Sequence, residues 1–170
     1  MRNQAKNITV TILLVLSFTL VAVYSNGQIN DHKIRLQVLK KGVVDSLFIF
    51  GKWTESGQEE THLKYLGKMI TRSGQTFKIV NSSWFWGHAH RATSRILIFN
   101  EKNQYIGNYY LTVVDDLPTS LENGNLIFHN TDAGCDKKVV TIINLKNGLP
   151  KSFFRKCKIK LGDIYTFDSE

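Results

Sequence analysis

Two histidines stand two residues apart in the segment Trp84–Arg91, which reads WFWGHAHR. In an extended chain alternate side chains point to the same face, so His88 and His90 could share one metal ion. Zinc and copper accept imidazole nitrogens, but a structural or catalytic site normally needs one or two further protein ligands. The residues that could supply them stand at no diagnostic spacing: His32, His62, His129, Asp115 and Asp116. The pattern fits a zinc-dependent hydrolase, but a polar loop with hydrogen-bonded or solvated imidazoles is the favoured interpretation.

The same segment could bind a sugar or an anion through its aromatic rings. Trp84 and Trp86 alternate along the chain, and Arg91 and Arg95 follow shortly after them. Tryptophan and tyrosine faces stack on sugar rings, and a flat β surface can present several of them. Large aromatic residues in a small domain are, in the alternative, core residues. We expect a binding site formed by Trp84, Trp86, Arg91 and Arg95 if these side chains are exposed.

No catalytic pattern is present elsewhere in the sequence. Asp115 and Asp116 are adjacent, so in an extended segment they diverge, and a paired-carboxylate mechanism would need another carboxyl group. They suit a turn before Leu117 and Pro118 better. The chain has no Gly-x-Ser-x-Gly motif and no glycine-rich phosphate loop. The sequence therefore predicts no catalytic residue and no cofactor, with zinc as the alternative.

The chain contains two cysteines, Cys135 and Cys157. An even pair in an oxidising compartment is typical of a disulfide. The bridge would close a loop of about 22 residues and stabilise the fold by roughly 3 kcal/mol on the chain-entropy model. Two buried free thiols are the alternative.

The amino-terminal segment has the pattern of a signal peptide. Arg2 and Lys6 form a basic start, and Ile8 to Val23 then carry no charge. This run is short for a spanning helix, which needs roughly 20 mostly apolar residues. Small residues at Ser25 and Gly27 predict cleavage after residue 27, with cleavage after Ser25 as the alternative. We expect an exported protein, periplasmic or secreted, with no stable membrane span after cleavage.

The charge of the chain is strongly positive and unevenly distributed. The full sequence carries +8, and removal of Arg2 and Lys6 leaves +6. The excess is concentrated in residues 136–160, which contain eight basic residues and one acidic residue, Asp136. In an exported protein this bias indicates an anionic or carbohydrate component of the cell envelope as partner, and no nucleic acid. A solvated surface that keeps the domain soluble is the alternative.

Short strands are the elements that must position these residues. Ile34, Leu36 and Val38 alternate with polar residues and predict a half-buried strand. Val43–Trp53 predicts a second strand, in which the apolar run Leu47–Phe50 suits burial on both faces. Further strands are predicted in the segments 63–70, 76–86, 95–99, 104–111, 126–129, 139–145, 153–161 and 164–167. No stretch after the signal peptide is amphipathic over a length that predicts a helix.

This spacing predicts an all-β fold: a single small antiparallel β-sandwich or β-barrel of about nine or ten short strands, preceded by a signal peptide. Residues 1–27 are the predicted signal peptide, and residues 28–170 form one predicted β-rich domain. A remainder of this length is enough for one ordinary hydrophobic core. No repeat, low-complexity tract or proline-rich linker indicates a domain boundary.

The segments Gly87–Arg95 and Ile96–Tyr110 and the turn Asp115–Pro118 resemble segments of small secreted proteins of the Bacteroidota. A mature start at Gln28 is similar to their usual signal cleavage. The resemblance covers the middle third of the chain and implies export from a Gram-negative cell. It implies no activity and no site residues.

Three functions fit these features. The preferred one is an exported, non-enzymatic binding or structural protein of the envelope or the extracellular space, whose ligand the sequence does not identify. The alternative is a secreted metal-assisted hydrolase that uses His88 and His90. A protein that acts through protein contacts alone is the third. The sequence leaves the oligomeric state open.

Overall fold

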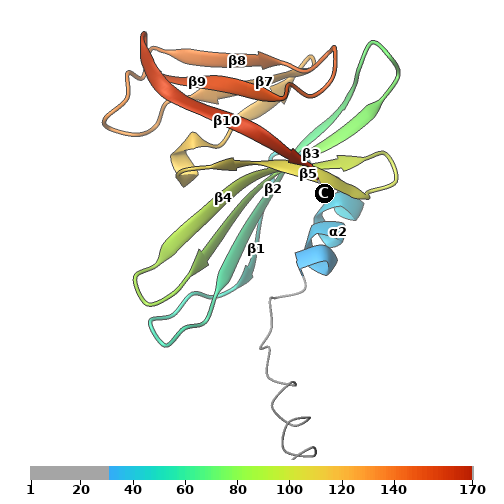
Figure 1. Cartoon of the computed structure of the whole chain (residues 1–170). Coiled ribbons are helices and arrows are strands. Elements are labelled where there is room, and N and C mark those ends of the chain that lie inside the picture. The colour runs from blue at the N-terminus through green and yellow to red at the C-terminus, as the bar shows by residue number, and fades with distance from the viewer. Residues whose placement is uncertain (1–30, 170) are drawn as a thin grey trace, which may run out of the picture. The chain divides into compact units, whose positions relative to one another are not determined.

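The structure is a computed structural model, and it describes residues 31–169. The predicted signal peptide, residues 1–27, and the predicted mature start at Gln28 lie outside the described residues. Residues 32–169 belong to one compact unit, and the described part of the chain has ten strands and one α-helix (Figure 1). The elements are α2 (Asp31–Lys41), β1 (Leu47–Gly51), β2 (Glu60–Ile70), β3 (Thr76–Trp86), β4 (Arg91–Asn100), β5 (Tyr105–Leu111), the 3-10 helix η2 (Val114–Asp116), β6 (Ser120–Glu122), β7 (Asn125–His129), β8 (Val140–Asn144), β9 (Ser152–Lys158) and β10 (Leu161–Ser169).

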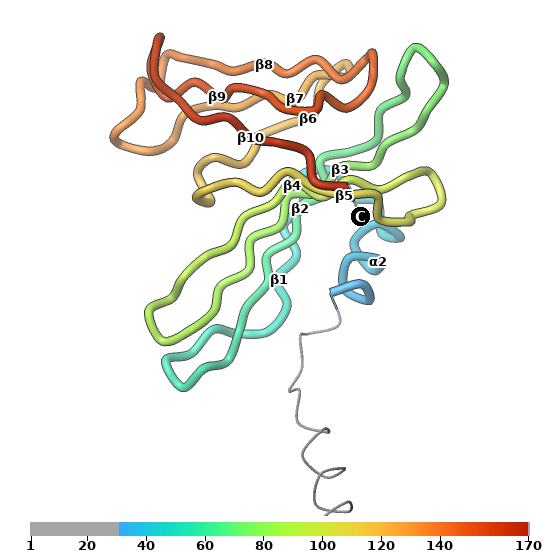
Figure 2. The backbone as a smooth tube through the Cα atoms, viewed as in Figure 1, coloured from blue at the N-terminus to red at the C-terminus, as the bar shows by residue number. Residues whose placement is uncertain are grey.

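The strands form two antiparallel sheets. A seven-stranded sheet has the order β1-β2-β3-β4-β5-β10-β9, and a three-stranded sheet has the order β6-β7-β8. The last strand, β10, lies between β5 and β9, and Figure 2 shows its path from one to the other. The all-β prediction is confirmed, and the strand number agrees with it.

Both sheets contribute to one hydrophobic core. Phe77 and Ile79 of β3 point into it with Leu126 and Phe128 of β7 and Phe153 of β9. The core residues of each strand are two positions apart because alternate side chains share a face of the strand. Two sheets that share a core in this way form a sandwich.

The strand predicted around Ile34 to Val38 is wrong, because Asp31–Lys41 form helix α2. Ile34, Val38 and Leu39 are buried, which is the i, i+4, i+5 spacing of a helix, and Leu36 is half-buried. Positions i and i+4 share a face in a helix and in a strand alike, so the short alternation did not distinguish the two. The helix ends at Gly42, whose positive φ of 61° suits a helix terminus.

Helix α2 packs on the face of the large sheet that points away from the core. The guanidinium of Arg35 lies 5.6 Å from the ring centre of Tyr105 in β5, and the ammonium of Lys41 lies 5.0 Å from that of Phe48 in β1. The helix therefore crosses the sheet. Leu63, Val80 and Leu97 point to this side and are fully buried, although they lie outside the core cluster.

Strand β1 is not buried on both faces, so that prediction is also wrong. Leu47 and Ile49 are 56% and 54% exposed, and the alternate residues Phe48 and Phe50 are half-buried. β1 lies at the edge of the sheet and pairs with β2 alone. A continuous apolar run indicates a strand, but the neighbours of the strand decide which faces are covered.

Two hairpin turns have the residues that their backbone conformations require. Asn123 and Gly124 connect β6 to β7 with φ values of 50° and 75°. Two consecutive positive φ values are the signature of a type I′ turn, for which Asn-Gly is a preferred pair. The connection Asn100–Asn103 joins β4 to β5 and closes with a hydrogen bond from the Asn103 amide to the Asn100 carbonyl.

Candidate functional site

The four residues predicted as a binding site lie on one face of the large sheet. In the β3–β4 pair, Trp84 is opposite Thr93, and Trp86 is opposite Arg91. Arg95 is opposite Ser82, two residues beyond Thr93 in β4. Side chains on directly paired residues share a face, and so do residues two apart. We call Trp84, Trp86, Arg91, Arg95 and the neighbouring Tyr110 the aromatic–arginine face.

The two tryptophan rings of this face are held in place. They stack with 5.6 Å between ring centres and 24° between ring planes. The indole N–H of Trp84 donates to Glu59 Oε2 at 3.1 Å, and that of Trp86 donates to Thr93 Oγ1 at 3.2 Å. Both side chains are half-buried. The stack therefore forms part of the surface with little freedom to rotate.

Each arginine of this face lies over an aromatic ring. The Arg91 guanidinium is 5.7 Å from the ring centre of Trp86, and the Arg95 guanidinium is 5.9 Å from that of Tyr110. Tyr110 is directly opposite Arg95 in the β4–β5 pair and is 55% exposed. Within residues 31–169, neither guanidinium forms an ion pair with a carboxylate. Aromatic stacking orients a guanidinium and leaves its N–H groups available to an anion.

His88 and His90 lie in the turn between β3 and β4, where the chain is not extended. His90 has a φ of 49°, and its ring packs against Trp53 at 4.3 Å and Phe85 at 5.0 Å between ring centres. His88 Nδ1 is 2.5 Å from the carbonyl oxygen of Glu55. Both imidazoles therefore have roles in holding the turn against the loop before β2.

Two of the other predicted metal ligands, His62 and Asp116, are engaged elsewhere. His62 Nε2 bonds to Glu60 Oε1, and this contact is the first cause that lowers the pKa of the Glu60 carboxyl. Asp116 forms an ion pair with Arg155. Among residues 31–169, no group of three or more His, Cys, Asp or Glu side chains is arranged to hold a metal ion. The zinc-dependent hydrolase stays a prediction with no ligand set in this part of the chain.

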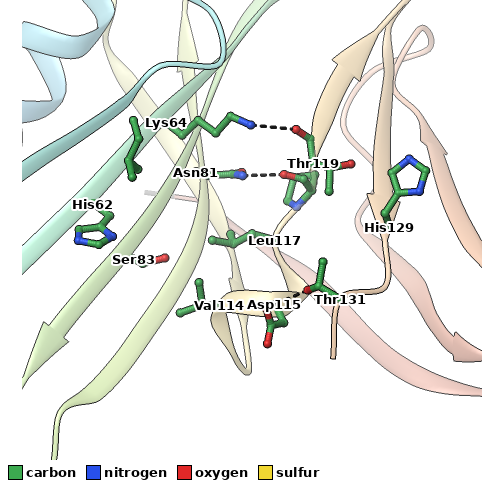
Figure 3. Close-up of a pocket in the computed structure, with 12 residues that line it drawn as sticks. His62, Lys64, Asn81, Ser83, Val114, Asp115, Leu117, Thr119, His129 and Thr131 are labelled. Atoms are coloured by element: carbon green, nitrogen blue, oxygen red, sulfur yellow. Dashed lines mark hydrogen bonds between the residues drawn. The ribbon is translucent and has the colours of Figure 1, made fainter. Parts of the chain in front are cut away.

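A pocket of about 330 Å³ lies between the two sheets, and the sequence did not predict it (Figure 3). Strands β2 and β3 form one wall, and η2 with the segments around β6 and β7 forms the other. It is lined by Leu47, His62, Lys64, Asn81, Ser83, Val114, Asp115, Leu117, Pro118, Thr119, His129 and Thr131.

The polar groups of this pocket mainly join its two walls. Lys64 Nζ donates to the Thr119 carbonyl at 3.1 Å and pairs with Asp45 at 3.0 Å. Asn81 Nδ2 donates to the Pro118 carbonyl at 2.7 Å, while Asn81 Oδ1 is buried without a protein partner. Because the lysine charge is already paired, the pocket is a weaker anion site than the aromatic–arginine face.

A sequence signal for the pocket does exist. Phe77, Ile79, Asn81 and Ser83 occupy successive positions on the core-facing side of β3, so this side changes from apolar to polar along the strand. Buried polar side chains are costly unless they have partners, so this change indicates a connection or a cavity at that end of the sandwich.

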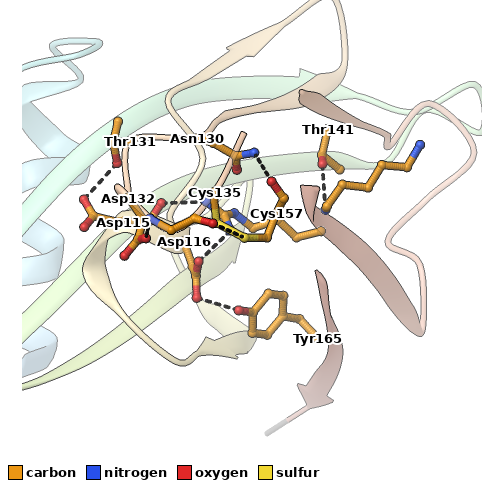
Figure 4. A network of polar contacts seen from close by, with 12 residues as sticks. Asp115, Asp116, Asn130, Thr131, Asp132, Cys135, Thr141, Cys157 and Tyr165 are labelled. Atoms are coloured by element: carbon orange, nitrogen blue, oxygen red, sulfur yellow. Dashed lines mark hydrogen bonds and ion pairs between the residues drawn. A yellow bond between two sulfur atoms is a disulfide. The ribbon is translucent and has the colours of Figure 1, made fainter. Parts of the chain in front are cut away.

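A buried network holds η2 to the last hairpin (Figure 4). Arg155 Nη1 lies 2.6 Å from Asp116 Oδ1, and Arg155 Nη2 donates to the Asp115 carbonyl at 2.9 Å. The Tyr165 hydroxyl donates to Asp116 Oδ2 at 2.6 Å. Arg155 and Asp116 are 2% and 6% exposed, so this network lies inside the fold and away from ligands.

The disulfide between Cys135 and Cys157 is present, as predicted. Their Cα atoms are 4.6 Å apart, and both residues are half-buried. The bridge attaches the loop between β7 and β8 to the end of β9. The Asp136 amide reinforces this connection by donating to the Cys157 carbonyl at 2.8 Å.

Comparisons with family models, curated proteins and solved structures found no match to this chain. Within residues 31–169, no helix combines the length and the apolar character needed to cross a membrane.

Proposed function

We propose that this chain is an exported, non-enzymatic binding protein that holds an acidic polysaccharide on the aromatic–arginine face. One observation carries the proposal: Arg91 and Arg95 share a face, lie over aromatic rings and have no carboxylate partner among the described residues. Two oriented guanidinium groups on one face, neither of them paired with a carboxylate there, give that face a positive potential that attracts an anion.

The chemistry of this face fits an acidic sugar better than a small anion. A guanidinium binds a carboxylate through two parallel hydrogen bonds. Arg91 and Arg95 are four residues apart on β4, so they are roughly 13 Å apart along the strand. Two such groups can bind two acidic groups of one polymer, while the exposed parts of Trp86 and Tyr110 contact the C–H groups of the sugar rings.

Export is part of the proposal and has two supports. The disulfide suits an oxidising compartment, because reducing systems keep thiols free in most cytosols. The charge and hydrophobic pattern of residues 1–27 predicts a signal peptide.

The proposal is tested by the binding of the protein to polygalacturonate, an acidic polysaccharide, with neutral dextran as the comparison polymer. The expected result is retardation in a gel that contains polygalacturonate and none with dextran. The double variant R91Q/R95Q should bind at least about tenfold more weakly, since each charged hydrogen-bonded contact contributes roughly 1.5–3 kcal/mol.

For the single variant Arg91→Gln, the matched control is Arg72→Gln, which removes the same charge at an exposed position where Nη1 donates to Asn147. It should retain wild-type binding. Equal losses for Arg72→Gln and Arg91→Gln would show that net charge alone causes retardation, and the proposed site would be wrong. Absence of binding to polygalacturonate would overturn the ligand class.

A further inference from the structure

The turn between β9 and β10 carries two of the most exposed apolar side chains of residues 31–169. Ile159 is 76% exposed and Leu161 is 62% exposed. Ile164 follows on the outward face of β10 at 70%, directly opposite Phe154 of β9 at 39%. Exposed apolar residues that gather in one place usually mark an interaction surface.

Lysines surround these apolar residues. Lys156, Lys158 and Lys160 alternate with Cys157, Ile159 and Leu161 along the chain and are exposed. The basic excess of the sequence therefore gathers at the end of one hairpin. Neither the core nor the aromatic–arginine face uses these side chains.

The disulfide brings two more lysines to the same place. Lys137 and Lys138 follow Cys135 in the loop between β7 and β8, and the bridge to Cys157 fixes that loop beside the end of β9. In Figure 1 this loop and the β9–β10 turn lie at the same end of the three-stranded sheet. We call Ile159, Leu161 and the lysines 137, 138, 156, 158 and 160 the lysine-rich tip.

The tip has a positive charge after its acidic neighbours are counted. Asp132, Asp136 and Asp163 lie in the same segments, so five lysines and three carboxylates leave +2. Two of these carboxylates already accept local hydrogen bonds, Asp132 from the Gly134 amide and Asp136 from the Lys138 amide. The lysine ammonium groups have no carboxylate partner within residues 31–169.

We propose that the lysine-rich tip docks on the surface of an anionic lipid bilayer, with Ile159 and Leu161 entering the boundary between headgroups and acyl chains. Apolar side chains at the end of a hairpin can enter that boundary, and lysine stems can lie along it while their ammonium groups reach the lipid phosphates. A protein partner would normally bind a broader surface with an apolar centre. The narrow apolar end with a ring of lysines fits a bilayer better.

This surface is separate from the aromatic–arginine face, so the two proposals can fail independently. Arg91 and Arg95 belong to β4, and the tip belongs to β9, β10 and the loop before β8. Variants of one surface should leave the binding of the other unchanged.

A fluorescent label tests whether the tip itself enters the bilayer. Cys135 and Cys157 form the disulfide and the chain has no free cysteine, so one introduced cysteine can be labelled alone. The full chain with Ile159→Cys carries an environment-sensitive fluorophore and is mixed with phosphatidylglycerol or phosphatidylcholine vesicles. The matched control is Ile70→Cys, at an apolar residue that is 61% exposed at the end of β2. Because the label reports its own surroundings, the apolar run of residues 8–23 does not confuse the result.

The expected result is a blue shift and brightening at position 159 with phosphatidylglycerol vesicles, little change with phosphatidylcholine, and none at position 70. In the variant K158Q/K160Q, the lipid concentration that gives half of the response at position 159 should rise by at least about tenfold, since each lysine near an anionic surface contributes to attraction. Its binding to polygalacturonate should be unchanged. An unchanged label at position 159 with anionic vesicles would overturn the proposal and leave an acidic protein as the partner that fits the tip. Equal responses at positions 159 and 70 would also overturn it.

Discussion

Tyr165 shows how one buried residue depends on its partners. Its hydroxyl donates to Asp116, and Asp116 in turn balances the charge of Arg155, a side chain that is 2% exposed. The adjacent acids at 115 and 116 were interpreted from the sequence as turn residues, and η2 agrees with that. The sequence did not reveal that Asp116 turns inward, because its partners are about 40 to 50 residues away in the chain.

The alkaline stability of the protein should depend on Tyr165. Burial first, and then the hydrogen bond to Asp116, raise the pKa of Tyr165 to about 12. Because the folded state favours the neutral phenol, this residue contributes its full stabilisation below pH 10, and the contribution is lost as the pH rises from 10 to 12. Tyrosinate absorbance should therefore show Tyr165 among the tyrosines that titrate late in the folded protein, with Tyr65 and Tyr109, whose pKa values burial also raises.

The variant Tyr165→Phe assigns that titration. It should remove one of the late-titrating groups and make the free energy of unfolding less dependent on pH between 10 and 12, as urea denaturation measures. A Tyr165 that ionises with the exposed tyrosines, while the protein remains folded, would contradict the buried hydrogen bond.

At the scale of elements, the hairpins were predictable from the sequence, but helix α2 and the edge strand β1 were not. Asn123 and Gly124 specify their turn locally, because their positive φ values are favourable for these residue types. Helix α2 and strand β1 depend on the large sheet to which they are attached. Their sequences indicate apolar faces, but the packing of neighbouring elements decides that α2 is a helix and that one face of β1 is exposed.

The two candidate sites also differ in whether the sequence could predict them. Alternation along a strand placed Trp84 and Trp86 on one face, and the β3–β4 register added Arg91 and Arg95. The pocket between the sheets needs segments that are far apart in sequence, such as Lys64 and Thr119. Pairing across a sheet can be anticipated locally, but packing between sheets cannot.

The pairing of β5 with β10 depends on Gly107. A Cβ atom at this position would lie 2.3 Å from the Asp168 carbonyl oxygen and 2.6 Å from Phe167 Cζ, and the φ of 145° disfavours other residues. Gly107→Ala should lower the free energy of unfolding by about 3 kcal/mol or more, because it adds a clash to the backbone strain.

The control for this prediction is Gly148→Ala. Gly148 also has a positive φ, 116°, but its Cβ would meet nothing within 4 Å. Its cost should be roughly 1 kcal/mol from backbone strain alone. Equal destabilisation of the two variants in urea would show that β10 does not approach Gly107 closely.

For the whole molecule, the disulfide links the two sheets. It joins the loop after β7, in the small sheet, to β9 at the edge of the large sheet. Removal of the bridge in the double variant C135A/C157A should lower the free energy of unfolding by roughly 3 kcal/mol, as expected for the loop that it closes. Urea denaturation measures the change, and a reducing agent should destabilise the wild type without affecting the variant. A reducing agent that leaves the wild type as stable as before would contradict this.

The position of β10 between β5 and β9 limits the order in which the large sheet can form. Residues 161–169 fill the gap between β5 and β9, so the large sheet is complete only when β10 has paired with both. When the chain emerges amino terminus first from a ribosome, the large sheet therefore cannot be completed until residues 161–169 are free. A product that stops before β10 would leave both neighbouring strands, β5 and β9, with unpaired backbone groups.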